Sequence, residues 1–442
     1  MPTQYSVVVR ELQDELLWER NDLEQAVKNA RKWDIPELDK YGIISAKGFL
    51  DFADWLVRGW VPTESTQGRD IYYILCVFYF VLSQEPLGSR QTKIHPLSIN
   101  KALKPLSEWV VKFSKAIGQR MNEEASISEA TITSFRNSPL FRIFEYEKDA
   151  PNWKTFNDFF YRKLDTPRRI EGPEDDKIVV FPADSTFGGA YAITESSEVV
   201  LKEEEWRIVK DEVVLKHLPW KVGDLLGKYG SIAPKGSPDT YGEMFKGGLW
   251  THVFLNVFDY HRQHAPVSGT VEVIDVIQGA AYLQVLVKTD EQVGHNYLEP
   301  CRLIAGNETN PSGINTLNAP DTPGYQFLQT RGVVIINNEN LGRVAILPIG
   351  MAAVSSVHVN DELLGKKVKK GDEISHFAFG GSDCVIMFEQ RARVSGFPDS
   401  DPASGEHFFY GEKLCRAYYK DPTAQNGTLN GQNGQTSRNG AR

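Results

Sequence analysis

The chain has 442 residues, of which 41% are hydrophobic and 24% are charged, a composition typical of a globular protein with about two or three structural units. Its formal net charge of -9 disfavours a nucleic-acid-binding role, because such proteins use a basic surface to neutralise phosphates. The four cysteines, Cys76, Cys301, Cys384 and Cys415, include no C-x-x-C pair, which argues against a zinc ribbon or a disulfide scaffold and favours a reducing compartment.

The first residues of the chain do not resemble a secretory signal. They carry acidic side chains such as Glu11 and Asp14 in place of a basic start and an apolar middle, so we expect a cytoplasmic protein. The longest apolar run, Ile71–Leu82, is well short of the roughly 20 residues that span a bilayer. We therefore expect no transmembrane segment, and the run indicates a buried helix or strand.

The first third of the sequence has a helical pattern. From Glu11 to Phe144, apolar residues recur at spacings of three and four, as in Leu103–Met121. The charged segment Tyr146–Trp153 contains a proline and is typical of a linker, and Phe156–Arg162 indicates a short helix after it. We predict a helical N-terminal domain over residues 1–148 and a second domain over residues 149–424.

The second domain has the period of two that is typical of strands, with Gly, Pro, Asn and Asp between the apolar runs. The expected strands lie within residues 178–184, 188–194, 198–202, 251–258, 269–277, 282–288, 332–338, 342–350 and 384–390. Two turn motifs, His264–Val271 and Val368–Ile374, resemble the paired hairpins of barrel-sandwich folds. The fold class is therefore expected to be α+β, with a mainly antiparallel second domain. The Asn-, Gly- and Gln-rich residues 425–442 predict a disordered tail.

The densest polar group in this half lies between Asn256 and Pro266 and includes His261 and His264. Three interpretations are open. With His252 the two histidines could bind a metal, although no H-E-x-x-H motif or cysteine accompanies them. They could also be structural, or they could act in acid and base catalysis.

A Gly-Gly-Ser segment, Gly380 to Ser382, separates two apolar strand-like runs. It is typical of a hairpin turn. Alternatively, the Ser382 hydroxyl attacks the adjacent Gly381 carbonyl, which glycine leaves accessible. Cys384 begins the second run, and we expect a small buried residue there rather than a thiol nucleophile.

An aspartate follows the first expected strand. Asp184 comes directly after Pro182-Ala183, a position typical of a turn former or a helix cap. Together, however, Asp184, His264 and Ser382 could supply the acid, base and nucleophile of a triad, whose order along the chain varies among convergent enzymes. The G-x-S-x-G elbow of ordinary serine hydrolases is missing.

These motifs resemble, in order, those of the phosphatidylserine decarboxylase family of pyruvoyl-dependent enzymes. They are F-x-x-F-F-x-R at Phe156–Arg162, P-A-D at Pro182–Asp184, D-Y-H-R-x-H at Asp259–His264 and F-G-G-S at Phe379–Ser382, with further likeness at Lys216–Gly227 and Pro348–Val357. The resemblance covers most of residues 150–395. It implies that residues 149–424 form the catalytic domain of a carboxy-lyase.

The resemblance also implies self-cleavage between Gly381 and Ser382. Ser382 would become a covalent pyruvoyl group, the cofactor of the enzyme, at the start of a fragment comprising residues 382–442. His264 would activate the serine and Asp184 would orient His264. The pyruvoyl ketone would form a Schiff base with the substrate amine, carbon dioxide would leave, and His261 would return a proton to carbon.

The N-terminal helices and the segment Phe254–Thr270 resemble a soluble, largely fungal branch of the family that includes L-tryptophan decarboxylases. We therefore expect a soluble L-amino acid as substrate, with an aromatic one as the first candidate. One alternative is phosphatidylserine, which would yield phosphatidylethanolamine. Another is a non-catalytic binding module, because Asp383 stands where the family commonly has Thr. The expected partners are the substrate and the two cleavage fragments, and a homodimer is left open.

Overall fold

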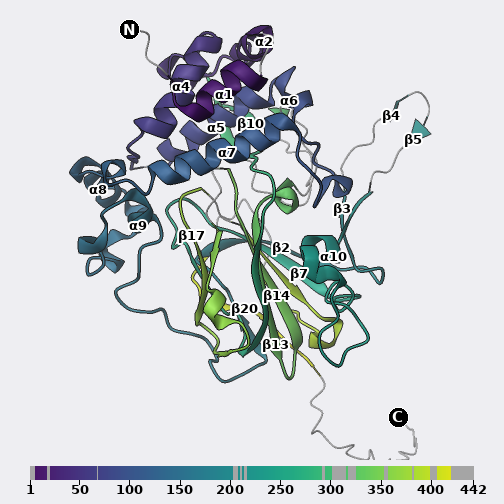
Figure 1. Ribbon diagram of the computed structural model, residues 1–442. Coiled ribbons are helices and arrows are strands. Elements are labelled where there is room, and N and C mark those ends of the chain that lie inside the picture. The colour runs from purple at the N-terminus through teal and green to yellow at the C-terminus, as the bar shows by residue number, and fades with distance from the viewer. Residues whose placement is uncertain are drawn as a thin grey trace, which may run out of the picture.

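The computed structural model describes residues 5–16, 20–66, 68–202, 208–209, 212–213, 217–290, 294–300, 315–316, 325–352, 357–380, 383–398 and 406–419. The predicted tail at residues 425–442 and the two residues of the expected cleavage bond, Gly381 and Ser382, lie outside these ranges. A group of helices packs beyond one end of a large antiparallel sheet (Figure 1). The α+β fold class predicted from the sequence is confirmed.

The helices come first along the chain. They are α1 (Val7–Glu11), α2 (Arg20–Arg31), α3 (Pro36–Lys40), α4 (Ala46–Arg58), α5 (Asp70–Ser83), α6 (Leu87–Arg90), α7 (Pro105–Arg120), α8 (Glu129–Arg136) and α9 (Phe156–Phe160). The long apolar run forms α5, and every residue from Ile74 to Ser83 is buried. A helix that is apolar on all sides has to be covered on all sides, and α5 accordingly lies at the centre of the group.

The segment expected to be a linker is packed. Tyr146 and Trp153 are buried, and the Asp149 carboxylate accepts hydrogen bonds from Trp153 Nε1 at 3.0 Å and from Lys163 N at 2.8 Å. The short helix predicted after it is α9, which begins with a capping box formed by Thr155 and Asp158. The domain boundary at residue 148 stays a prediction.

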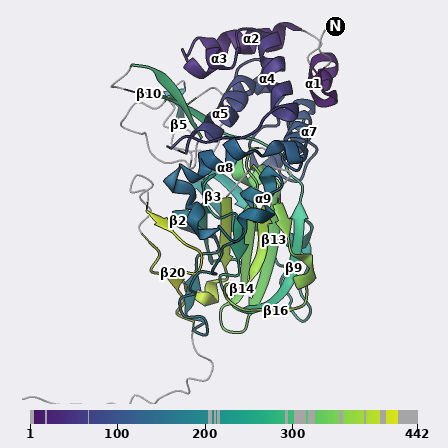
Figure 2. The same cartoon turned by 90° about the vertical axis from the view of Figure 1, so that its left-hand side faces the viewer.

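The main sheet has eight strands in the order β16-β9-β13-β14-β18-β7-β2-β19. Their bounds are β2 (Ser185–Ala192), β7 (Leu249–Phe254), β9 (Gly269–Ile277), β13 (Arg331–Asn338), β14 (Gly342–Ile349), β16 (Lys367–Val368), β18 (Asp383–Phe388) and β19 (His407–Phe408). All of these neighbours pair antiparallel. Figure 2 shows the helices grouped beyond one end of this sheet.

Smaller strand groups complete the fold. β15 (Val357–Val359), β17 (Glu373–Phe377) and β8 (Arg262–His264) form one sheet, and β10 (Val285–Thr289), β11 (Asn296–Pro300) and β12 (Asn315–Thr316) form another. Three further sheets have two strands each: β1 (Ile178–Val180) with β20 (Lys413–Arg416), β3 (Glu198–Lys202) with β6 (His217–Lys221), and β4 (Ile208–Val209) with β5 (Glu212–Val213). Helix α10 (Val222–Leu225) follows β6. Each strand expected from the sequence has a counterpart. Short strands such as β8 and β17 were not predicted, because a few residues carry too little periodicity.

The two turn motifs that resemble barrel-sandwich hairpins lie side by side. Strand β16 pairs with the start of β9, and Gly371 N donates a hydrogen bond to Ala265 O at 2.9 Å. Ala265 N in turn donates to Asp372 O at 2.8 Å. The two motifs, which are about a hundred residues apart in sequence, are therefore joined by backbone hydrogen bonds.

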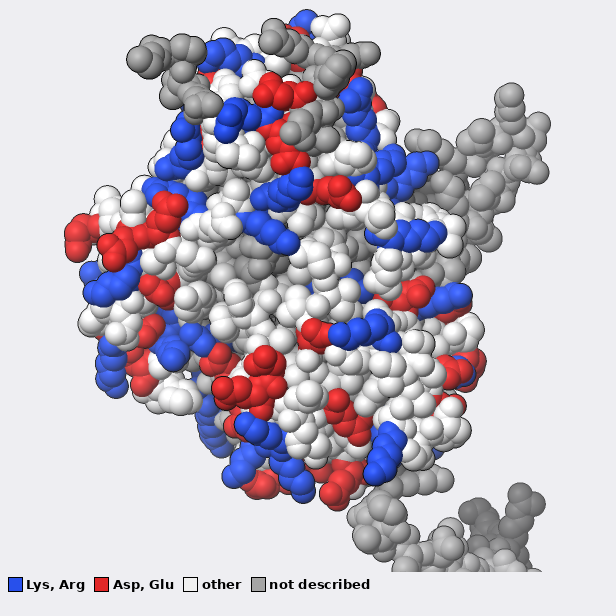
Figure 3. All heavy atoms as spheres, viewed as in Figure 1, with Lys and Arg blue, Asp and Glu red and all other residues white. Residues whose placement is uncertain are grey.

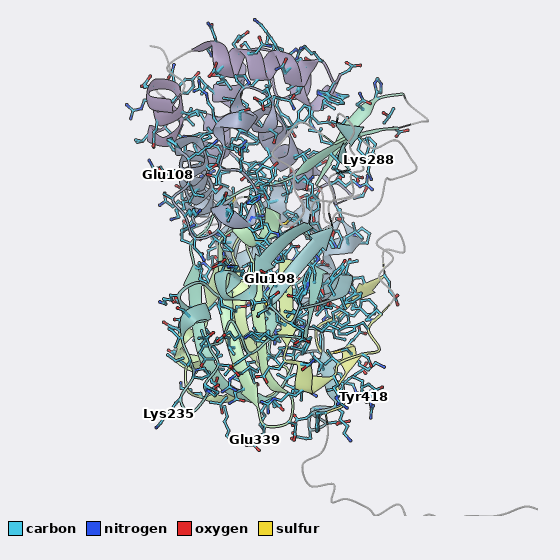
Figure 4. The ribbon with its side chains drawn as sticks, turned by 90° about the vertical axis from the view of Figure 1, so that its right-hand side faces the viewer. Glu108, Glu198, Lys235, Lys288, Glu339 and Tyr418 are labelled. Carbon is cyan, nitrogen blue, oxygen red and sulfur yellow. The ribbon has the colours of Figure 1, made fainter. Side chains whose placement is uncertain are left out.

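Both faces of the main sheet are buried, and strand β18 shows this most clearly. On one face, Val385 and Met387 belong to the apolar cluster that also contains the helices. On the other, Cys384 and Ile386 pack in a second cluster with Val179. Figure 4 shows Glu339, in the turn between β13 and β14, at the end of the sheet that is far from the helices. Glu108 of α7 lies in the helical part, toward the other end of the molecule.

The surface carries mixed charge. On the face shown in Figure 3, Lys and Arg are interspersed with Asp and Glu, and no large basic patch is visible. This distribution agrees with the net charge of -9 and gives that face no broad field that would attract a polyanion.

Candidate active site

The expected cleavage bond lies where strand β18 begins, at the end of the sheet that meets the helices. Asp383, the first residue of β18, is opposite Phe254 of β7 and Ile349 of β14. On the other side of the bond, Gly380 has a φ of 132°, a backbone conformation that favours glycine. Both flanks of the bond are therefore fixed by the fold.

Helix α9 holds the residues that precede the bond. The Phe379 ring packs edge-on against Phe156 and Phe160, with centroid distances of 5.4 Å to each, and against Trp60 at 5.3 Å. Phe379 N donates a hydrogen bond of 2.8 Å to the Asn157 side-chain oxygen. The F-x-x-F-F-x-R motif therefore acts as a clamp on the segment that leads to Gly381.

The arginine of the same motif supports the histidine loop. Arg162 is buried and donates a hydrogen bond of 2.8 Å to Phe258 O, and its guanidinium lies 4.4 Å from the centre of the Tyr146 ring. Because the loop from Phe258 leads directly to His261, Arg162 connects α9 to the group of polar residues between Asn256 and Pro266.

His261 lies beside this clamp. Its ring stacks on Phe160 at 3.9 Å, and its backbone carbonyl accepts a hydrogen bond from Phe377 N at 2.9 Å. Nε2 lies 3.1 Å from Val257 O, and since a carbonyl can only accept, Nε2 carries the proton. Nδ1 then holds a lone pair, and this buried atom has no hydrogen-bond partner among the described residues. Burial, assisted by the nearby Arg162, lowers the pKa of His261 to about 3, so the ring is neutral.

His264 is neutral as well, but its nitrogens are occupied. Nδ1 donates a hydrogen bond of 2.7 Å to Gly371 O, so Nε2 accepts from the Tyr260 hydroxyl at 3.1 Å. The ring stacks on Tyr410 with a centroid distance of 3.8 Å. Burial lowers the pKa of His264 to about 4.

Asp184 is buried and is held by Arg168. Nη2 of Arg168 lies 2.5 Å from Asp184 Oδ2, and Nε lies 3.1 Å from Oδ1. Tyr410 N donates a further hydrogen bond of 2.9 Å to Oδ1. Arg168 also bonds Glu145 at 3.0 Å, so this guanidinium links Asp184 to a residue of the N-terminal region.

The structure brings Asp184 and His264 to the same corner without joining them. Both contact Tyr410, but no hydrogen bond connects the carboxylate to the imidazole among the described residues. His264 is paired with Glu373 at the start of β17, whereas the backbone carbonyl of His261 accepts a hydrogen bond from Phe377 at its end, about 10 Å further along the pair of strands. His261 is therefore nearer the cleavage position, and the triad of Asp184, His264 and Ser382 stays a prediction.

Several residues at this site were not identified from the sequence as functional. Arg168, Tyr410 and His407 contact the predicted residues from segments that carry no recognisable motif. His407 Nε2 lies 2.8 Å from Asp259 Oδ1. Burial by itself would lower the pKa of His407, but the contact with the Asp259 carboxylate outweighs burial and raises this pKa above its ordinary value. Of the pair His407 and Asp259, only Asp259 belongs to a motif that the sequence identified, D-Y-H-R-x-H.

Two alternatives from the sequence can be placed. His252, considered as a third metal ligand, lies with its Nε2 3.1 Å from Asp383 Oδ1, and the described part of the chain contains no group of three His, Cys, Asp or Glu side chains arranged to hold a metal. Cys384 is fully buried, and burial raises the pKa of its thiol, as expected for a small buried residue rather than a nucleophile.

An apolar cavity of about 30 Å³ adjoins the cleavage position. Its walls are Tyr72, Leu75, Phe160, Phe254, Leu255, Val257, Leu283, Met351, Ala352, Phe379 and Gly380. Phe160 and Phe379 thus belong both to the clamp and to the cavity wall, and Tyr72 and Leu75 come from helix α5. The cavity therefore lies between the N-terminal helices, the sheet and Gly380, which is the residue before Gly381. No helix within the described ranges combines the length and the apolarity needed to cross a bilayer.

The chain is similar in sequence to several named proteins. It is 27% identical over 304 residues to phosphatidylserine decarboxylase proenzyme 2 of Oryza sativa, covering 68% of this chain and 39% of the rice protein. It is 26% identical to decarboxylase iboD of Amanita muscaria, with 62% and 69% of the two chains covered. It is 23% identical to L-tryptophan decarboxylase of Psilocybe cubensis, with 62% and 55% covered.

The match to the rice protein thus involves well under half of that protein's length, and the match to proenzyme 3 of Schizosaccharomyces pombe involves 25% of its length. A sequence model described as phosphatidylserine decarboxylase matches residues 156–416, which include all four ordered motifs and more than half of the chain. The chain belongs to the phosphatidylserine decarboxylase family.

Proposed function

We propose that the chain is a self-processing, pyruvoyl-dependent decarboxylase that removes the α-carboxylate of a small L-amino acid with an apolar side chain, and most favourably an aromatic one. Family membership supports decarboxylase chemistry. The apolar cavity beside Gly380 is the observation that carries the choice of substrate.

The residues around the cleavage position fit a pyruvoyl group formed from Ser382. A small cavity adjoins Gly380, and His261, which stacks on the wall residue Phe160, has a buried Nδ1 atom without a hydrogen-bond partner among the described residues. Once formed, the group supplies a ketone that combines with the substrate amine and withdraws electrons from the bond to the carboxylate. The remaining task of the protein is to place the substrate, exclude water and manage one proton.

His261 is suited to manage that proton. Its Nε2–H is fixed by Val257 O, so only Nδ1 can exchange a proton. The lowered pKa keeps the resting ring neutral with a lone pair at Nδ1, so a proton taken up there from solvent would be passed on readily to a carbanion, and the ring would return to its neutral form. Stacking on Phe160 fixes the plane of the ring and thereby the direction in which Nδ1 delivers the proton.

The cavity favours an apolar side chain over a phospholipid headgroup. In phosphatidylserine the phosphate is attached to the serine side-chain oxygen, close to the reacting carbon. A phosphate needs cationic or N–H partners when it leaves water, and none of the described wall residues is charged. The hydroxyl of Tyr72, the main polar group of the wall, already accepts a hydrogen bond of 3.0 Å from Val257 N.

The free volume of about 30 Å³ has space for little more than a water molecule, so a substrate side chain can enter only if a wall moves. Gly380 is the wall residue that is best placed to move. Cleavage after Gly381 would make Gly380 the penultimate residue of the first fragment and would release it from the strand that follows. Self-cleavage would then both create the reactive group and open the cavity.

A panel of substrates tests this proposal. We expect carbon dioxide release by the purified, processed protein to be fastest with free aromatic L-amino acids, slower with leucine and absent with aspartate. Vesicles that contain phosphatidylserine form the second arm, because the names of the relatives favour that lipid. Turnover of the vesicles alone would contradict the amino-acid proposal, whereas the absence of turnover in every arm of a processed protein would contradict the enzymatic one.

Helix α5 offers a sharper prediction about selectivity. Leu75 lies in the cavity wall but outside residues 156–416, the part that matches the family. Leu75→Ala should enlarge the cavity and change the ratio of kcat/KM for tryptophan over leucine by about tenfold, the usual effect of one or a few methylene groups in an apolar pocket. Both kcat/KM values are measured on the same processed preparation, so the fraction of uncleaved protein does not affect their ratio.

Leu82→Ala provides the matched control for this measurement. Leu82 is buried in the same helix and is not part of the cavity wall, so its truncation should cost comparable stability and leave the ratio unchanged. An equal change of the ratio in both variants would show that α5 affects activity only through general packing.

A further inference from the structure

Tyr410 contacts both of the buried side chains that are predicted to form a triad with Ser382. Its ring lies parallel to the His264 imidazole, with a centroid distance of 3.8 Å and an angle of 4° between the two planes. Its backbone N–H donates a hydrogen bond of 2.9 Å to Asp184 Oδ1, and the residue is itself buried. Tyr410 therefore lies between the carboxylate and the imidazole and touches both.

A closed set of hydrogen bonds fixes Tyr410 relative to Asp184. The Asp184 carboxylate accepts from the Tyr410 backbone and from the Arg168 guanidinium, whose Nη2 lies 2.5 Å from Oδ2. The Arg168 backbone N–H in turn donates a hydrogen bond of 3.0 Å to the Tyr410 hydroxyl. Each of the three residues is thus bonded to the other two, and a satisfied buried network of this kind is rigid. The position of the Tyr410 ring follows from it.

The hydrogen bonds of His264 do not fix the plane of its ring. Nδ1 donates to Gly371 O at 2.7 Å and Nε2 accepts from the Tyr260 hydroxyl at 3.1 Å. Two such bonds leave the imidazole free to tilt about the line that joins the two nitrogens. A flat partner against one face removes this freedom, and the Tyr260 ring is too far away for that, with its centroid at 5.7 Å. The closer ring of Tyr410 therefore sets the plane of His264 and the direction of its nitrogens.

The segment that carries Tyr410 is anchored beside this corner. Phe408 stacks on Phe181 with a centroid distance of 4.6 Å, and β19 pairs with β2. The segment follows the expected cleavage position, so Tyr410 would belong to the smaller fragment, whereas His264 and Asp184 would belong to the larger one. The smaller fragment would thus contribute a second residue to the site, besides the one that becomes the pyruvoyl group.

We propose that Tyr410 is a positioning residue for self-cleavage, whose ring holds the plane of the His264 imidazole and whose backbone N–H holds the Asp184 carboxylate. It acts on the Gly381–Ser382 bond only through these two groups. The inference rests on the proposed self-cleavage.

Rates of self-cleavage in three variants test this role. Tyr410→Leu removes the flat face against His264 and should slow cleavage by about tenfold or more, because a misaligned base loses much of its effect. Tyr410→Phe keeps the ring and the backbone N–H and loses only the hydroxyl that accepts from Arg168 N, so its rate should stay within about threefold of the natural chain. Phe408→Leu is the matched control. It removes a stacked ring from the same segment, on Phe181 rather than on His264, and should cleave normally.

Carbon dioxide release per cleaved molecule separates positioning from general packing. His264 is predicted to act in cleavage and not in turnover, so the cleaved fraction of Tyr410→Leu should have the kcat and KM of the natural protein. In an uncleaved Ser382→Ala background, Tyr410→Leu and Phe408→Leu should lower the melting temperature by similar amounts. If Tyr410→Leu does not fold there, Tyr410→Met takes its place, because its flexible side chain fills the same space without a flat face.

Three results would overturn the inference while leaving the proposed function intact, because the natural chain would still be cleaved. They are normal cleavage by Tyr410→Leu, cleavage by Phe408→Leu or Tyr410→Phe that is as slow as that of Tyr410→Leu, and an equal loss of cleavage and turnover. Failure of the natural chain to cleave would instead contradict the proposed function and the inference with it.

Discussion

Replacing Ser382 with alanine is expected to leave a single chain of 442 residues that releases no carbon dioxide from any amino acid. The reason is chemical. The hydroxyl is the proposed nucleophile for the Gly381 carbonyl and also the source of the pyruvoyl ketone, and alanine supplies neither. On a denaturing gel the natural chain should give two fragments, residues 1–381 and 382–442, and intact-mass analysis should show the blocked start of the smaller one.

Ser375→Ala is a suitable control for this experiment. Ser375 is a buried serine of β17, and its hydroxyl donates a hydrogen bond of 2.8 Å to the Gln263 side-chain oxygen. Its loss should reduce stability slightly, by about 1 kcal/mol, and should leave cleavage intact. Cleavage that persists in Ser382→Ala would rule out the pyruvoyl mechanism, and a natural chain that stays whole would favour the alternative of a binding module.

Replacing His261 with phenylalanine should separate cleavage from turnover. The ring would still stack on Phe160, so the clamp and the cavity wall should survive and the chain should still be cleaved. The proton carrier at Nδ1 would be lost, however. Loss of a positioned acid or base typically lowers the rate by about 10² to 10⁴, so carbon dioxide release should fall by that factor with little change in KM.

His264→Gln is the informative comparison, because its predicted role is in cleavage and not in turnover. The two variants should therefore fail at different steps: His264→Gln should accumulate uncleaved chain, whereas His261→Phe should accumulate cleaved but inactive protein. Full activity of a cleaved His261→Phe protein would show that another group handles the proton. Rapid cleavage of His264→Gln would remove His264 from the triad, a result compatible with its hydrogen bonds to Tyr260 and Gly371.

Much of the fold could be predicted from local patterns. Short apolar runs bounded by Gly and Asn identified the long strands such as β13 and β14, because a strand that is buried on both faces is apolar at nearly every position. The run at Ile71–Leu82 was left open between helix and strand, because it is apolar at every position and has no periodicity to decide between them. Its burial among the other helices settles the choice in favour of α5.

The candidate site was predicted as a set of residues rather than as an arrangement. Asp184, His261 and His264 were all named from their motifs, and the structure places them within one region. Their contacts were not predictable. Asp184 is bonded to Arg168 and to the backbone of Tyr410, more than two hundred residues away, and no local spacing encodes a contact over that distance.

The sequence by itself determined the family, the α+β class and the position of the proposed bond, since these depend on ordered motifs and on periodicities within a few residues of one another. Only the tertiary structure decided what surrounds that bond. The register between β7 and β18 places His252 Nε2 3.1 Å from Asp383 Oδ1, and the packing of α5 brings Leu75 to the cavity beside Gly380. Both depend on contacts between distant segments, where small shifts in register or packing decide which side chains meet. The Gly-Gly-Ser segment thus marks where the proposed chemistry occurs, and the surrounding fold determines which substrate could reach it.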